Sequence, residues 1–214
     1  MGIRLRVVFS FLAGVLLACS LQAQQARKAG SLEPTVTSPA SGAITNGVYR
    51  NTGFGFNYKL PFGWVDRTKE ISDDSSEESD GPRKSTLLLA VFERPPEATG
   101  DTVNSAVVVA AEPTSSYPGL RNAAQYFEPL TGLTKSKGLA VVNQPYDYSV
   151  GTRQLVRGDF SKPLGNLTMH QSTLVMVEKG YLVSFTFIGG SEDEVDGLVE
   201  SLTFSRKETL APHK

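Results

Sequence analysis

The sequence has few of the residues on which many enzymes depend. Among 214 residues there is one cysteine, Cys19, and there are two histidines, His170 and His213. One cysteine cannot form a disulfide within the chain, so the core must stabilise the fold alone. Histidine is the side chain best suited to proton transfer near neutral pH, and it is a common metal ligand. Its scarcity limits both kinds of chemistry.

The charges of the chain nearly cancel. The sequence has 21 basic and 22 acidic residues, for a formal net charge of -1, and it contains no strongly basic run. Proteins that neutralise nucleic-acid phosphates usually present a basic face. Nucleic acid is therefore not an expected partner.

Motifs for catalysis and cofactor binding are missing as well. G-x-S-x-G, G-x-x-x-x-G-K-[ST] and G-x-G-x-x-G do not occur, so the usual signals for a nucleophile elbow, a P-loop and a dinucleotide site are absent. The acidic run KEISDDSSEESDGPRK, residues 69–84, lacks the alternating ligands and the terminal glutamate of a calcium loop. We interpret it as a solvated loop, with metal binding as the alternative. The sequence thus predicts no catalytic residue, no cofactor and no metal.

The N-terminus matches a secretory signal peptide. Arg4 and Arg6 precede an uncharged, mostly apolar run at residues 7–17, which is too short to cross a hydrocarbon core of about 30 Å as a helix. The order of these parts is that of an export signal. Cleavage after Ala23 would remove residues 1–23. Alternatively, LLAC resembles a bacterial lipoprotein box, in which case residues 1–18 would be removed and Cys19 would carry lipid.

Both alternatives place the folded part outside the cytoplasm, in the periplasm or secreted. Membrane association is expected only through lipidation of Cys19. Residues 24–46 are rich in Ala, Gly, Ser, Thr and Pro and should form a flexible linker. Residues 47–206 should form a single α+β globular domain, followed by a flexible tail at residues 207–214.

An aromatic stretch, YRNTGFGFNYKLPFGW, opens this domain. Phe54, Phe56 and Tyr58 alternate with other residues, which predicts a half-buried strand with these rings on its inner face. A proline ends the strand. Phe62 and Trp64 lie beyond it, and we expect them to return to the core, with an exposed patch for a protein partner as the alternative.

The next part of the domain alternates between strand and helix patterns. The apolar segments at residues 85–93 and 104–112 predict neighbouring central strands that are covered on both faces. Apolar residues at helical spacing between residues 118 and 128 predict a helix that ends or kinks near Pro129.

The last part of the domain predicts a strand meander and a helix. Four strand patterns are joined by short turns, which favours antiparallel hairpins. Ser191 and Glu194 then form a capping box for an amphipathic helix at about residues 192–201. The four strand segments are residues 139–150, 152–161, 167–180 and 181–190.

A few polar residues on these strands are candidates for chemistry. Asp147 and Asp159 could act as general acids if their pKa were raised, but we interpret them as strand-end or solvent-face residues. Arg153 and Arg157 share one strand face, where they would either bind an acidic group or, as we expect, pair with acids across strands. We interpret His170 as a surface or hydrogen-bonded structural residue, because a single histidine without a partner cannot define a site.

The order of elements resembles a known family. The opening FGFNYKLPFGW, the apolar strands and the closing YLVSFTFIGGSEDEVDGLVESLTF are similar to the PsbP/Mog1-like fold family over about residues 47–205, of which this chain would be an exported bacterial member. The resemblance implies a central antiparallel sheet with helices packed on its faces, an α/β/α sandwich. Members of this group are mostly non-catalytic accessory or binding proteins. The resemblance identifies no functional residue in this chain.

Two functions are therefore compatible with the sequence. The first is an exported, non-enzymatic accessory or binding domain that acts through a protein partner in the cell envelope. The alternative is an unrecognised hydrolase or small-ligand carrier that uses a cleft between sheet and helix. A deep pocket with converging polar groups would favour the alternative, whereas shallow grooves alone would count against it.

Overall fold

The structure is a computed structural model that describes residues 42–77 and 85–205. The predictions for the signal peptide, for Cys19 and for the tail at residues 207–214 lie outside these residues, as does most of the predicted linker. Within the described residues, no helix is long and apolar enough to cross a membrane.

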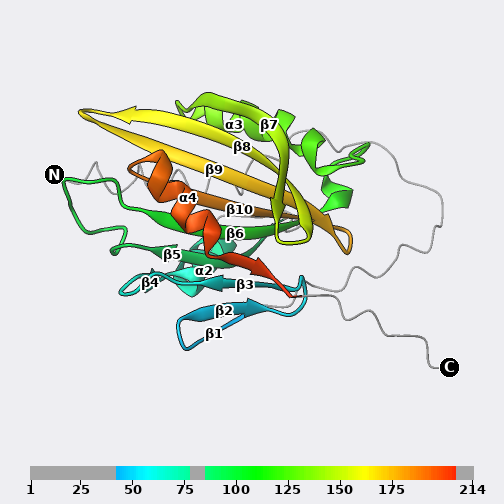
Figure 1. Ribbon diagram of the computed structural model, residues 1–214, viewed down its shortest axis with the longest axis horizontal. Helices are drawn as coiled ribbons and strands as arrows, with labels where there is room; N and C mark the ends of the chain where they lie inside the picture. Colours follow the sequence, from blue (N-terminus) through cyan, green and yellow to red (C-terminus); the bar gives the residue numbers. More distant parts are fainter. Residues whose placement is uncertain (1–41, 78–84, 206–214) are drawn as a thin grey trace.

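The domain is built on two antiparallel sheets (Figure 1). Within the described residues, the large sheet has seven strands in the order β4-β5-β6-β10-β9-β8-β7, and the small sheet has four in the order β1-β2-β3-β11. The strands of the large sheet are β4 (Val65–Asp66), β5 (Thr86–Phe92), β6 (Ala106–Pro113), β7 (Ala140–Val150), β8 (Arg153–Leu164), β9 (Leu167–Glu178) and β10 (Tyr181–Gly189). Those of the small sheet are β1 (Ala43–Thr45), β2 (Val48–Asn51), β3 (Phe56–Lys59) and β11 (Leu202–Phe204).

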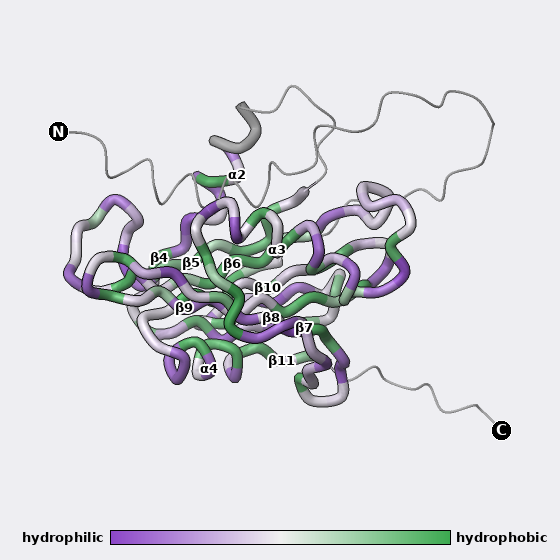
Figure 2. The backbone as a smooth tube through the Cα atoms, turned by 90° about the horizontal axis from the view of Figure 1, so that it is seen from above, coloured by the Kyte–Doolittle hydropathy of each residue, from purple (hydrophilic) through white to green (hydrophobic). Residues whose placement is uncertain are grey.

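Helices cover both faces of the large sheet, as Figure 2 shows for α2 and α4. The small sheet and α4 pack on one face, and α2, α3 and η2 pack on the other. This arrangement confirms the predicted α+β class, with an antiparallel sheet and helices on its faces. The helices are α2 (Thr68–Glu77), α3 (Phe127–Ser136) and α4 (Glu192–Glu200), with short 3-10 helices η1 (Thr114–Ser116) and η2 (Ala123–Tyr126).

The aromatic opening forms the inner face of the small sheet. Phe54, Phe56 and Tyr58 are all buried, as the alternation predicted. Phe56 packs edge-on against Phe185 of β10, with ring centroids 4.9 Å apart. Aromatic pairs in this geometry add to the stabilisation that burial alone provides. The small sheet is thus fixed to the large one by rings that come from both ends of the domain.

The central strands and hairpins agree with the sequence patterns. Every residue of β6 except Pro113 is buried, because both faces of this strand are covered. Strands β7 to β10 form consecutive antiparallel pairs. The turn from β9 to β10 has positive φ at Lys179 and Gly180, which is the backbone of a type I′ hairpin turn.

Part of the acidic run is a helix, so the prediction of a solvated loop is wrong for residues 69–77. The carboxylate of Asp66 accepts hydrogen bonds from the backbone N–H of Thr68 at 2.9 Å and from its hydroxyl at 2.6 Å. Ile71 is buried on the large sheet among apolar residues of β5 and β6. A capped first turn and one apolar anchor therefore outweigh the polar composition. Residues 78–84 of the run lie outside the described part.

The helix predicted to end near Pro129 is displaced along the chain. The segment before it forms η2, where the side chain of Asn122 accepts from the backbone N–H of Gln125. The α-helix α3 starts only at Phe127. Pro129 lies in its first turn, where a missing N–H leaves no helical hydrogen bond unmade. The proline is the third residue of this helix and does not end it.

The C-terminal helix confirms the capping prediction. Ser191 accepts from the backbone N–H of Glu194 at 3.2 Å, and the apolar side of α4 is buried on the large sheet. The carboxylate of Glu194 accepts from the N–H of Gly190 at 2.8 Å and from the hydroxyl of Ser105 at 2.5 Å. These bonds attach the start of α4 to the residue that precedes β6. Strand β11, which the sequence analysis did not anticipate, pairs with β3 directly after the helix.

Candidate functional site

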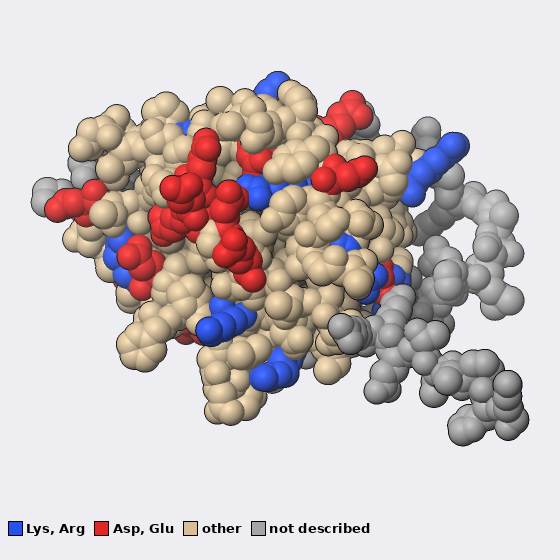
Figure 3. All heavy atoms as spheres, viewed as in Figure 1, with Lys and Arg blue, Asp and Glu red and all other residues tan. Residues whose placement is uncertain are grey.

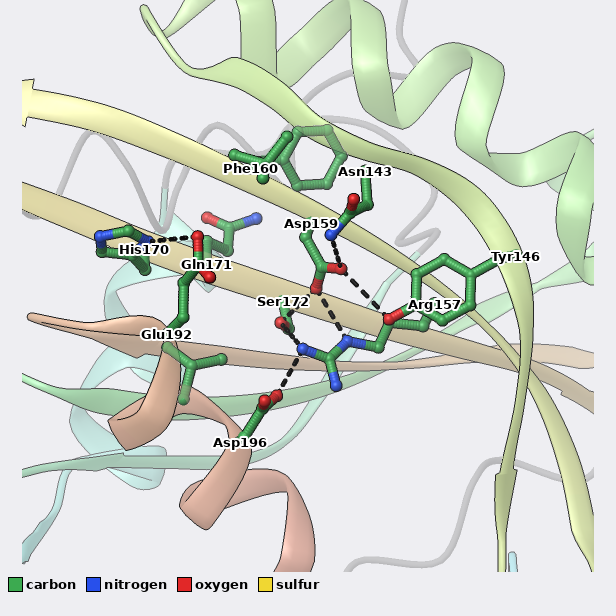
Figure 4. A pocket seen from close by; sticks show the side chains of 12 residues that line it. Asn143, Tyr146, Arg157, Asp159, Phe160, His170, Gln171, Ser172, Glu192 and Asp196 are labelled. Atoms are coloured by element: carbon green, nitrogen blue, oxygen red, sulfur yellow. Dashed lines mark hydrogen bonds and ion pairs between the residues drawn. The ribbon is translucent and has the colours of Figure 1, made fainter.

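A cleft of about 170 Å³ lies between α4 and strands β7, β8 and β9 (Figure 4). It lies on the face of the large sheet that also carries the small sheet. Its polar lining comes from all four elements, so residues far apart in the sequence converge there. The side chains that make up its polar cluster are Asn143, Tyr146, Arg157, Asp159, Ser172 and Asp196.

Arg157 lies at the centre of this cluster. It shares a face of β8 with Asp159, two residues later, and its Nε donates to Asp159 Oδ1 at 2.8 Å. Its Nη2 donates to Ser172 on β9 at 2.9 Å and to Asp196 on α4 at 2.6 Å. The guanidinium also lies over the ring of Tyr148, 5.2 Å from its centroid. One side chain thus connects two strands to the helix above them.

Asp159 accepts four hydrogen bonds. Its Oδ1 accepts from Arg157 and from the hydroxyl of Ser172, the latter at 2.5 Å. Its Oδ2 accepts from Asn143 at 3.0 Å and from the hydroxyl of Tyr146 at 3.2 Å. A carboxylate has about four lone-pair positions, so Asp159 has no acceptor capacity left for a ligand.

Irregular pairing of β7 brings Asn143 and Tyr146 together. These residues are three apart, so a regular strand would point them to opposite faces. Asn143 pairs with Asp159 and Tyr146 with Arg157, which leaves one extra residue on β7 between the two pairs. Such a bulge shifts the alternation by one, and Pro145 within it has no N–H to contribute to the ladder. Both side chains therefore reach the same carboxylate.

Gly158 allows the opposite face of β8 to be packed closely. A Cβ atom built on this glycine would lie 2.6 Å from Cε1 of Phe127, the first residue of α3. Only a residue without a side chain permits this approach. The sequence Arg157-Gly158-Asp159 thus places two charged groups in the cleft on one face and seats α3 on the other.

Hydrogen bonds determine the charge states of Arg157 and Asp159. Burial alone would raise the pKa of the Asp159 carboxyl, but hydrogen bonds from Ser172, Arg157 and Asn143 outweigh burial and hold that pKa below its ordinary value. Burial alone would lower the pKa of Arg157, but its hydrogen bonds to Asp159 and Asp196 outweigh burial and raise it. The pKa of Tyr146 is raised to about 12 by burial and by the negative charge of Asp159. Asp159 and Arg157 are therefore a fixed ion pair at neutral pH.

The cluster provides little for acid–base catalysis. The hydroxyl of Ser172 donates a hydrogen bond to Asp159. The lowered pKa of this carboxyl makes the carboxylate a weak base, poorly suited to activating Ser172. His170 lies two residues before Ser172, but its polar contact is with Glu192 of α4, at 3.7 Å between Nδ1 and Oε1. Among the described residues, no group of three or more His, Cys, Asp or Glu side chains could hold a metal ion. The arrangement is suited to binding.

The rim of the cleft is acidic. Helix α4 carries Glu192, Asp193, Glu194, Asp196 and Glu200 and no basic residue. Figure 3 shows acidic side chains gathered over this helix. Glu192 and Asp196 line the cleft, and their side chains are 70% and 55% exposed.

The polar residues singled out from the sequence have different environments. Arg153 pairs across strands with Glu178 at 2.9 Å, as expected. Arg157 shares the face of Arg153 but pairs with Asp159 and Asp196. Asp147 is exposed on β7. Asp159 is only 7% exposed and lies in the middle of β8, so its interpretation as a strand-end or solvent-face residue is wrong.

His170 lines the cleft with its side chain 21% exposed, and its Nδ1 lies 3.7 Å from Oε1 of Glu192, so it is neither a freely exposed surface residue nor held by a hydrogen bond from this nitrogen. The aromatic patch lies elsewhere. Phe62 is fully exposed at 105% of its reference area, so the expectation that it returns to the core is wrong: it lies in a turn in which the N–H of Trp64 donates to the carbonyl of Pro61. Trp64 is half-buried against the core between the two sheets. Neither residue lines the cleft.

Four residues of the cluster were missed in the sequence: Asn143, Tyr146, Ser172 and Asp196. Pro145 within a strand pattern is a signal for the bulge. No local signal identifies Ser172 or Asp196, because their role depends on an arginine on another element.

A second buried carboxylate lies on the opposite face of the sheet. Glu112 of β6 is 5% exposed and accepts hydrogen bonds from the hydroxyls of Tyr117 and of Tyr126, the latter at 2.7 Å. Burial raises the pKa of Glu112 although both hydroxyl bonds act to lower it. This carboxylate attaches the segment of η1 and η2 to the sheet.

Comparisons with known proteins concern the fold alone. No protein-family model matches the sequence, and no curated protein matches it. The structure is similar to cyanobacterial PsbP from Synechocystis sp., with a TM-score of 0.47, 16% identity, and coverage of 74% of this chain and 91% of that chain. It is also similar to Mycobacterium tuberculosis LpqN, described as involved in cell envelope biogenesis (TM-score 0.40, 13% identity, 71% and 83% coverage). A third similar structure is a Pseudomonas aeruginosa protein of unknown function (TM-score 0.37, 10% identity, 78% and 100% coverage).

Proposed function

We propose that this chain is a non-enzymatic binding domain of the cell envelope that acts through a protein partner, and that the cleft beside α4 is its recognition site. One observation carries the proposal. Asp159, the most buried acid of the cleft, accepts four hydrogen bonds from the domain itself. A carboxylate held in this way organises a binding surface but has no free lone pair with which to take a proton from a substrate.

A hydrolase is less well supported by the same cleft. Ser172 is the hydroxyl available as a nucleophile, and its proton already points to Asp159. Activation would need a base near neutrality, and His170 makes its polar contact with Glu192 instead. Ser172 and His170 of the cleft therefore do not form the pair of nucleophile and base that acyl transfer requires.

The volume of the cleft favours a protein partner over a free small molecule. Pockets for small ligands usually enclose about 300–1,000 Å³, whereas this cleft has about 170 Å³. A space of that size accommodates one side chain of a larger partner. The envelope location rests on the export signal expected at residues 1–23, and N-terminal sequencing of the mature protein together with lipid labelling of a Cys19→Ala variant tests it.

Capture from the native envelope with matched variants tests the binding site. Val142→Trp adds bulk at the mouth of the cleft, where Val142 is 44% exposed. Val177→Trp is the control, because Val177 is 42% exposed on β9 and does not line the cleft. The wild-type chain and the control should retain a partner that Val142→Trp loses. Identical captures for all three chains, or hydrolysis of model esters that Ser172→Ala abolishes, would overturn the proposal.

A further inference from the structure

We propose that the cleft binds a basic side chain, lysine or arginine, presented by the protein partner. This inference rests on the proposed function and specifies the chemistry of its ligand. Four features support it: the charge of the rim, the apolar walls, a free donor on Arg157 and the size of the space.

The charges at the cleft leave a negative excess. The positive charge of Arg157 is matched by Asp159 at 2.8 Å and shared with Asp196 at 2.6 Å. Asp196 uses one oxygen for this bond and is 55% exposed, and Glu192 beside it is 70% exposed. Counting these four groups, the cleft carries two more negative than positive charges. A cation entering between Glu192 and Asp196 would find carboxylate oxygens from neighbouring positions on one helix.

Apolar surface at the cleft fits the stem of a long basic residue. Val142 is 44% exposed and Tyr146 is 39% exposed, and both line the cleft. These are two of the six large apolar side chains that are exposed in the described residues. The methylene groups of lysine and arginine pack on such surfaces while the charged end reaches a polar partner. The ring of Tyr146 can also attract a cation placed over its face.

Arg157 retains donor capacity for the backbone of the partner. The residue is 9% exposed, and its Nε and Nη2 are both engaged. Its Nη1 makes no hydrogen bond with the described residues and carries no dashed line in Figure 4. A peptide carbonyl next to the basic side chain can accept from this nitrogen. The cleft therefore offers a donor for the backbone and carboxylates for the side chain.

Other ligand classes fit less well. A metal ion would need three or more suitable ligands close together, and no such group exists among residues 42–77 and 85–205. An anion would meet Glu192 and Asp196 at the mouth, while three of the five N–H groups of Arg157 are already used. The volume of about 170 Å³ suits one side chain.

Titration of the full chain with short blocked peptides tests this inference. The probes are Ac-Gly-Arg-Gly-NH2 and Ac-Gly-Lys-Gly-NH2, with neutral citrulline and acidic glutamate in the central position as controls. Amide chemical shifts report where each peptide binds. We expect saturable shifts around Ser172 and Asp196 with the two basic peptides and none with the controls.

Two double variants that remove the same number of charges distinguish binding in the cleft from attraction to the overall negative charge of α4. Glu192→Gln with Asp196→Asn removes the two acids that line the cleft, and Asp193→Asn with Glu200→Gln removes two acids of the same helix that do not. The first variant should bind the basic peptides about fivefold more weakly, as expected for the loss of two partly exposed ion pairs. The second should bind within about twofold of the wild-type chain, because Asp193 and Glu200 are exposed and contribute no contact in the cleft, so solvent and salt screen their charges. Thermal unfolding checks that both variants remain folded.

The outcomes also separate this inference from the proposed function. Equal weakening by both double variants overturns the inference, since the helix would then act only through its overall charge. Saturable binding of the citrulline or glutamate peptide in the cleft overturns it while leaving the binding site itself in place. If neither basic peptide gives saturable shifts, the inference is wrong, and the proposed function then depends on the capture experiment with Val142→Trp.

Discussion

Arg157 on β8 donates to Asp196 on α4, with Nη2 2.6 Å from Oδ1, and this ion pair crosses the cleft from sheet to helix. The same nitrogen also donates to Ser172 on β9. The helix is therefore positioned over the strands by a polar contact as well as by its apolar face. Because Arg157 is also bonded to Asp159, the shape of the cleft depends on the whole network.

The Asp159→Asn variant tests this network. The change preserves the size of the side chain but leaves the buried guanidinium of Arg157 with Asp196 as its remaining ion-pair partner. We expect the free energy of unfolding to fall by about 2–4 kcal/mol, the usual cost of removing one member of a buried charged pair. Chemical denaturation at pH 7 measures the loss. Asp147→Asn on β7 is the control and should change stability by less than about 0.5 kcal/mol, because Asp147 is exposed.

The effect of Asp159→Asn should also depend on pH. The folded-state pKa of Asp159 lies below the ordinary value of 3.8. Its charge therefore stabilises the fold above that pH, and this contribution is lost as the pH falls through the lowered pKa. The stability difference between the wild-type chain and the variant should shrink on acidification. A difference that grows below pH 4 would contradict the assignment.

Glu112 should give the opposite pH dependence. Its folded-state pKa is raised above the ordinary value of 4.5 by burial. The protonated form is thus favoured in the fold, and stability from this group is lost as the pH rises from 4.5 through the folded-state pKa. Relative to Glu112→Gln, which is neutral throughout, the wild-type chain should become less stable over this range. Denaturant unfolding of both chains between pH 4 and 8 measures the difference in stability. If the wild-type chain became more stable relative to the variant as the pH rises, the assignment would be refuted.

Gly158 should tolerate no side chain. In Gly158→Ala, the new Cβ would lie 2.6 Å from a ring carbon of Phe127, so α3 or β8 must move. Overpacking of this kind costs about 1–3 kcal/mol. Gly132→Ala is the matched control, because nothing lies within 4 Å of its Cβ position on α3. The control should stabilise the domain by up to about 1 kcal/mol through helix propensity. Equal effects of the two changes on the denaturation midpoint would contradict the packing argument.

Phe62 and Phe56 separate surface from core in the aromatic opening. Phe62→Ala removes a fully exposed ring and should change the free energy of unfolding by less than about 0.5 kcal/mol. Phe56→Ala empties a fully buried position and should cost about 3–5 kcal/mol. If Phe62 belongs to a patch for a protein partner, Phe62→Ala should weaken capture of that partner without loss of stability. Unchanged capture would remove Phe62 from the interface.

Local patterns in the sequence determined most of the elements. The alternation of Phe54, Phe56 and Tyr58 identified the inner face of the small sheet, and the capping box at Ser191 identified the start of α4. These signals hold because the period of a strand or a helix decides which side chains can share an apolar face. The helix α2 was missed, because its anchor, Ile71, needs the large sheet to bury it. The proline in α3 was misinterpreted, because its position relative to the first turn depends on where the helix starts.

The cleft depended on the tertiary structure. Arg157 and Asp159 stand two apart on one strand, so the sequence could place them on the same face. Ser172 and Asp196 join them only after β9 pairs with β8 and α4 packs across both strands. Asn143 and Tyr146 join them because of an extra residue in β7, whose effect on pairing is decided by the neighbouring strand. Hydrogen bonds act over about 3 Å, and such distances between distant parts of a chain exist only once it has folded.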